Sequence, residues 1–173
     1  MIYMKMLLTG LFALFISGCA PSLNKQNMGV PSNEVTLRVS KSSVGDIIVT
    51  GGSSVTGQID SVSLKDAILQ TLTNTKVFKV VSPKNSPDYT LHAEIISLEK
   101  PKIGFEIKSV LRVKYFILRA SSNQLIWMDE FTSSYTATTG DSFFGPGRLT
   151  KANEGAVREN LRQLVTALSE QML

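Results

Sequence analysis

Apolar and polar residues alternate along several stretches of the chain, and this pattern predicts strands with one buried face. About five strands are expected, at residues 35–40, 77–82, 89–95, 105–119 and 125–135. In the strand at 105–119, Leu111, Val113, Tyr115 and Ile117 face one way, and Arg112, Lys114 and Phe116 face the other. The glycine-rich segment Lys41–Gln58 stays open between a short strand at Ile47–Val49 and a mobile hairpin or loop.

Apolar residues at three- and four-residue steps predict two amphipathic helices. The first begins at Ser63, a capping residue with Asp66 three positions later, and ends near residues 73–76. The second runs for about 20 residues from Leu149 to the C-terminus. We therefore expect an α/β (α+β) fold, in which a mixed, mostly antiparallel sheet of about five strands has two helices packed on one face.

The N-terminus predicts a secretion signal in residues 1–18. Lys5 precedes an apolar core at Leu7–Ile16, which is followed by two small residues. This apolar core is too short to span a membrane stably. Residues 19–33 are rich in Ser, Asn and Gln and predict a flexible tether, and residues 34–173 predict a single domain.

The only cysteine, Cys19, directly follows this signal, and the stretch Leu14–Ala20 resembles the lipobox of bacterial lipoproteins. The resemblance implies that Cys19 starts the mature chain and carries an S-diacylglycerol and an N-acyl chain such as palmitate. A buried or redox-active cysteine is the alternative. Ala20 stands where an aspartate would signal retention at the inner membrane, so the resemblance implies a lipid anchor on the periplasmic face of the outer membrane.

The charge pattern gives no indication of nucleic-acid binding. The formal net charge is +4 and includes Lys5 of the signal. The remaining cations are scattered, and the densest run, Lys100–Lys114, alternates with acidic and apolar residues as a solvated strand face does.

No group of side chains in the sequence predicts catalysis or a metal site. The only histidine, His92, lies on the polar side of a predicted strand without partner ligands. Asp129 and Glu130 are neighbours in a strand and point to opposite faces. We expect a protein that is not an enzyme and that carries no cofactor besides the lipid on Cys19.

The pair Phe143-Phe144 lies in a second glycine-rich segment, Thr136–Arg148. The two rings are expected either to cover the end of the core or to form an exposed contact. The covering arrangement is favoured because exposed aromatic pairs are costly without a partner. If a partner is bound, Phe143, Phe144 and Arg148 are the expected contact residues. Glu154 and Arg158, four residues apart on the last helix, predict a surface ion pair.

Three segments resemble a fold shared by several envelope lipoproteins. They are the helix and strand at 67–81, the strand start Asp88–Ile95 and the helix segment Ala152–Leu161. They are similar to the curli secretion channel lipoprotein family, to lipoprotein activators of penicillin-binding proteins and to the N-terminal domain of the Tol translocation protein. The resemblance favours an accessory or assembly factor that binds another envelope protein.

Two other functions stay open. An auxiliary lipoprotein of lipid or lipopolysaccharide transport would need an apolar cleft lined by Leu111, Val113 or Trp127. An oligomeric secretion-channel subunit would insert hairpins into the membrane, and the segments 41–58 and 136–148 are short for that purpose. The sequence does not determine the oligomeric state.

Overall fold

The computed structural model describes residues 22–35, 38–52, 59–99 and 104–171. They contain a five-stranded sheet with the strand order β2-β1-β3-β4-β5. The strands are β1 Ser43–Gly51, β2 Lys79–Val80, β3 Tyr89–Leu98, β4 Ile107–Arg119 and β5 Leu125–Ala137. The helices are α1 Lys25–Met28, α2 Ser61–Thr75, α3 Gly145–Gln171 and the short 3-10 helix η1 Pro83–Asn85.

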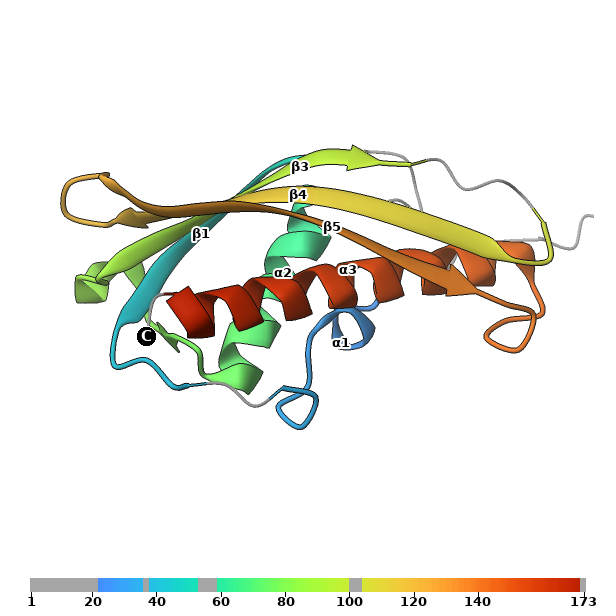
Figure 1. Cartoon of the computed structure of the whole chain (residues 1–173), viewed down its shortest axis with the longest axis horizontal. Helices are drawn as coiled ribbons and strands as arrows, with labels where there is room; N and C mark the ends of the chain where they lie inside the picture. Colours follow the sequence, from blue (N-terminus) through green and yellow to red (C-terminus); the bar gives the residue numbers. More distant parts are fainter. Residues whose placement is uncertain (1–21, 36–37, 53–58, 100–103, 172–173) are drawn as a thin grey trace, which may run out of the picture.

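The long helix α3 and helix α2 lie on one face of the sheet, and α1 packs against both of them (Figure 1). β1 runs parallel to β2 and β3, while the pairs β3–β4 and β4–β5 are antiparallel. The predicted fold class is therefore confirmed. The opposite face of the sheet has no described helix over it (Figure 1).

The core lies between the inner face of the sheet and the two large helices. The four apolar residues that were predicted to share one side of β4 are all fully buried. Burial of such side chains contributes about 1.5–3 kcal/mol each to folding. Tyr115 is the polar member of this set, and its hydroxyl donates to Oδ1 of Asn160 on α3 at 2.8 Å. Burial raises the pKa of Tyr115 well above its ordinary value, so the hydroxyl stays protonated and keeps this bond.

Strand β1 occupies the segment that the sequence left open between a strand and a loop. Val44 and Ile47 are both buried although they are three residues apart, because the pairing with β3 shifts register between them. Gly45 lies so close to Pro87 that a Cβ at this position would overlap the proline ring. The register shift interrupts the alternation of apolar and polar residues, so the sequence pattern alone does not identify this strand.

The strand predicted at 35–40 is wrong for its described residues, 35 and 38–40. The amide of Arg38 donates to Oγ of Ser169 at 2.8 Å, and the amide of Ser40 donates to the carbonyl of Val77 at 3.3 Å. A helix side chain and a single carbonyl thus satisfy these amides in place of a neighbouring strand.

The two predicted helices are present, and both begin earlier than expected. The side chain of Asp60 accepts a 2.8 Å hydrogen bond from the amide of Ser63, so Asp60 caps α2 in place of Ser63. Helix α2 ends at Thr75, within the predicted range, and Lys76 follows with a φ of 55°. Helix α3 begins at Gly145, four residues before the predicted start at Leu149.

Residues 22–35, which we call the N-terminal strap, do not form the flexible tether predicted for residues 19–33. Met28 is 1% exposed and Val30 is fully buried, and both belong to the main hydrophobic core. The amide of Val30 donates to Oγ1 of Thr71 on α2 at 3.1 Å. Two apolar side chains therefore hold a segment whose overall composition is polar.

Candidate functional site

Three phenylalanine side chains are strongly exposed at the end of the molecule where α3 begins. Phe143 is 93% exposed, Phe144 is 68% exposed, and Phe105, just before β4, is 86% exposed. We call these three residues the aromatic tip. The favoured prediction that Phe143 and Phe144 cover the end of the core is wrong, and the exposed alternative is the observed one.

Arg148, in the first turns of α3, joins the two loops that carry the aromatic tip. Its Nη1 donates to the carbonyls of Ser142 at 3.0 Å and Phe143 at 2.7 Å, and its Nη2 donates to the carbonyl of Gly104 at 3.3 Å. The guanidinium thus lies among backbone carbonyls. Arg148 therefore positions the phenylalanines, and its role as a direct partner contact stays a prediction.

The turn before the aromatic tip is closed by Asp141. Its carboxylate accepts hydrogen bonds from the amide of Thr138 at 2.8 Å and from the hydroxyl of the same residue at 3.1 Å. These two bonds lower the pKa of Asp141, so the turn remains closed at neutral pH. The exposed rings are therefore held by ordered backbone.

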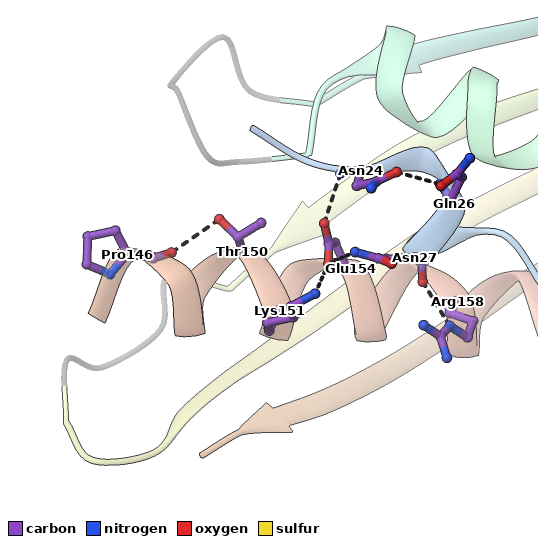
Figure 2. A network of polar contacts seen from close by, with 8 residues as sticks. All are labelled: Asn24, Gln26, Asn27, Pro146, Thr150, Lys151, Glu154 and Arg158. Atoms are coloured by element: carbon purple, nitrogen blue, oxygen red, sulfur yellow. Dashed lines mark hydrogen bonds and ion pairs between the residues drawn. The ribbon is translucent and has the colours of Figure 1, made fainter. Parts of the chain in front are cut away.

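Glu154 of α3 fastens the N-terminal strap (Figure 2). Its side chain is almost fully buried, and it accepts 2.8 Å hydrogen bonds from the amide of Asn24 and from Nδ2 of Asn27. Lys151 supplies the balancing charge at 3.3 Å. Arg158 donates from Nε to the carbonyl of Asn27 at 2.8 Å, so the predicted Glu154–Arg158 pair is wrong because both side chains bind the strap.

The strap is held on the N-terminal half of α3, the helix that begins beside the aromatic tip. Glu154 is nine residues from Gly145, and at about 1.5 Å per residue the two positions are about 14 Å apart along the axis of α3. Figure 2 shows Asn24 beside Glu154, with Thr150 and Pro146 farther toward the start of α3. Asn24 is therefore held about 14 Å along α3 from the start of that helix.

The uncovered face of the sheet carries a row of mostly apolar side chains. The strand registers place Ile48, His92, Phe116 and Met128 side by side on β1, β3, β4 and β5. Ile48 is 43% exposed and Met128 is 47% exposed, while His92 and Phe116 are half-buried. We call these four residues the outer row. His92 lies on the outer face of the sheet, as its place in the predicted strand indicated.

The apolar cleft expected for a lipid-transport protein is not formed by its predicted lining residues. Leu111 and Val113 are completely buried under the helices. Trp127 is half-buried, and its indole N–H donates to Oε1 of Gln171 at 2.7 Å.

The described ranges contain no group of three or more His, Cys, Asp or Glu side chains that could hold a metal ion. None of the helices within those ranges is both long and apolar enough to cross a membrane. Cys19, the predicted lipidation site, and the predicted signal in residues 1–18 lie outside the described residues.

No protein-family model matches the chain, and no curated protein matches its sequence. Solved structures do match its fold. A Xanthomonas campestris protein of the family DUF330 has a TM-score of 0.57 at 13% identity, with 88% of this chain and 95% of that chain covered. A candidate lipoprotein from Caulobacter crescentus has a TM-score of 0.53 at 12% identity, with 75% and 89% covered. A hypothetical protein from Chlamydia trachomatis has a TM-score of 0.50 at 9% identity, with 76% and 100% covered.

At these identities the matches establish a shared fold and nothing finer. The chain thus has a fold found in bacterial proteins that include a candidate lipoprotein. The curli, penicillin-binding-protein activator and Tol families that the sequence resembles are not among these three matches.

Sequence reasoning missed three parts of this site. Phe105 has a signal in the sequence, because Gly104 precedes it in a break between two strands. The outer row has only the weaker signal of apolar residues on the polar side of several strands. The buried position of Glu154 has none, because its partners lie about 130 residues away in the strap.

Proposed function

We propose that this protein is a non-enzymatic lipoprotein of the outer membrane, anchored by acyl chains on Cys19, that binds another envelope protein as an accessory or assembly factor. The lipobox-like stretch at Leu14–Ala20 and the fold shared with a candidate lipoprotein support the anchor. Two or three acyl chains hold a protein on a bilayer without any inserted protein segment.

The observation that carries the binding role is the outer row on the uncovered sheet face. Ile48 and Met128 expose apolar surface at opposite ends of the row, with His92 and the ring of Phe116 between them. A sheet face of this kind can pack against another protein, and partly exposed apolar side chains are typical of the centre of such an interface.

The next row of the sheet gives this surface a polar border. Glu94, Lys114 and Glu130 are paired across β3, β4 and β5, and Glu130 also lies 3.4 Å from Nε of Arg112. An apolar centre beside a charged border is the usual anatomy of a protein interface.

The ionisable groups near the strap favour a structural role over catalysis. The carboxylate of Glu154 binds the strap, and that of Glu159 forms bonds of 2.6 and 2.8 Å with Arg162. General acid–base chemistry needs a carboxyl group that is free to exchange a proton with a substrate. Both of these carboxylates are instead engaged by cations or amides.

Site-specific photo-crosslinking in intact cells tests the proposal. A photoreactive amino acid at Met128 should give one discrete adduct with an envelope protein. The same group at Lys65, which is exposed on α2, is the matched control and should give none. Absence of an adduct at both Met128 and Ile48 would contradict the proposal. An adduct with the mass of two copies of this chain would favour the ring-forming subunit instead.

A further inference from the structure

We propose that the aromatic tip is a membrane-contact surface, which rests on the lipid bilayer that holds the acyl chains of Cys19. The inference builds on the proposed lipid anchor and assigns a ligand, a lipid surface, to Phe105, Phe143 and Phe144. It separates two contacts on one domain, because the tip meets lipid while the outer row meets protein.

Hydrogen bonds from Arg148 to the loop backbones hold the three rings in exposed positions. Arg148 joins the carbonyls of Phe143 and Gly104 through one guanidinium, and these bonds hold the two loops together with their rings exposed. Phenylalanine has no polar atom that could bind water or a polar protein group. Rings exposed by 68 to 93% on an ordered turn are therefore suited to an apolar phase.

The short segment between Cys19 and the strap limits how far the domain can lie from the bilayer. Five peptide units separate Cys19 from Asn24, and five residues span at most about 17 Å when fully extended. Asn24 is fixed to Glu154, which lies about 14 Å along α3 from the helix start beside the tip. A lipid on Cys19 would therefore keep Asn24 within about 17 Å of the bilayer surface, a distance similar to the one that separates Glu154 from the start of α3.

The charges around the tip favour apolar contact over electrostatic attraction. Among the described residues, Lys108, Arg148 and Lys151 are cations near the tip, and Lys151 is paired with Glu154. Glu106 and Asp141 are exposed carboxylates beside the phenylalanines. These charges nearly cancel, so the contact should not require anionic lipids and should persist at high salt.

Spin-label immersion measurements on the full-length lipidated protein test the proposal. A nitroxide is attached at Phe143→Cys, and its collision rates with oxygen, which enriches in lipid, and with a water-soluble nickel chelate are compared in reconstituted vesicles. Val62→Cys on α2 is the matched control, because Val62 is also an exposed apolar residue, 69% accessible. Vesicles of phosphatidylethanolamine with phosphatidylglycerol and vesicles of phosphatidylcholine alone are used in parallel.

We expect oxygen to dominate at residue 143 and the nickel chelate to dominate at residue 62 in both kinds of vesicle. Equal, water-like behaviour at the two positions would overturn the membrane contact. Shielding of residue 143 from both reagents only when envelope proteins are added would assign the tip to a protein partner and would also overturn it.

A second variant tests whether the three rings act as one surface. With the label at Phe105→Cys, replacement of Phe143 and Phe144 by serine should move the label into water. A label that stays immersed after this change would contradict a shared surface. Failure of the anchor itself is seen separately, because an unlipidated Cys19 would not float with vesicles and would take up a second label.

Discussion

The carboxylate of Glu154 accepts a hydrogen bond from the backbone N–H of Asn24 at 2.8 Å, across 130 positions of the chain. Glu154 lies on the long helix α3, and Asn24 caps the short helix α1. This contact fixes the start of the folded domain on the N-terminal half of α3. The segment between a lipidated Cys19 and the folded domain is therefore much shorter than the tether predicted for residues 19–33.

Replacement of Glu154 by glutamine should loosen the N-terminal strap. The change leaves Lys151 without its partner and turns one acceptor oxygen into a donor facing Asn24 or Asn27. We expect a loss of about 1–3 kcal/mol in the free energy of unfolding. Hydrogen exchange measured by mass spectrometry should show faster exchange over residues 24–30.

The matched control is Glu159→Gln, which removes a more exposed ion pair with Arg162 on the same helix. Exposed pairs are worth at most about 1 kcal/mol, so this variant should leave the exchange of the strap unchanged. Equal effects of the two variants would show that Glu154 has no special role in holding the strap.

Helix α3 lies close against strand β5 at Gly155. A Cβ at this position would overlap the ring of Tyr135. Gly155→Ala should therefore destabilise the fold by about 1–3 kcal/mol, despite the better helix propensity of alanine. Chemical denaturation measures the change, and Gly140→Ala, in an exposed turn, should be close to neutral. A Gly155→Ala protein as stable as the wild type would show that the ring can move aside.

Arg148 should control the order of the aromatic tip. Replacement by methionine keeps much of the aliphatic stem and removes all three hydrogen bonds to the loop carbonyls. We expect chymotrypsin to cleave after Phe143 and Phe144 faster than in the wild type, while the global melting temperature changes little. Unchanged cleavage at the tip would contradict the positioning role.

Protonation of Asp88 should account for part of the loss of stability at acidic pH. This residue ties β3 to the start of β1, because its carboxylate accepts hydrogen bonds from the amide and the hydroxyl of Ser43 at 2.7 and 2.8 Å. These bonds lower its pKa from the ordinary value of 3.8. A lowered pKa in the folded state gives stability that is present above pH 3.8 and is lost as the pH falls toward the folded value.

Denaturation curves between pH 6 and pH 3 on the wild type and Asp88→Asn measure this contribution. The wild type should lose stability more steeply below about pH 4 than the variant does. Parallel curves would show that Asp88 contributes nothing to the acid sensitivity.

Much of the fold could be predicted because its signals are local. The alternation on β4 and the period of α3 both mark large buried apolar and aromatic side chains, as Tyr115 and Leu161 show. Strand β1 could not be predicted with the same certainty, since its register shift at Val44–Ile47 breaks the alternation.

The candidate site could be predicted only in part, because its arrangement depends on distant contacts. Phe143 and Phe144 were identified, but their exposure follows from how Arg148 joins its own loop to the carbonyl of Gly104, 44 residues away in the chain. The role of Glu154 was missed for the same reason, since a favourable four-residue spacing to Arg158 pointed to a local ion pair. Contacts with the strap outweigh that spacing in the folded chain.

Mass spectrometry of the protein extracted from membranes tests the lipid anchor most directly. We predict that the mature chain begins at Cys19 and that its N-terminal peptide carries a diacylglycerol on the sulfur and an acyl chain on the amino group. A Cys19→Ala variant should keep its signal and lack both modifications. A wild-type chain with an unmodified Cys19, or one that still begins at Met1, would contradict the proposed lipoprotein.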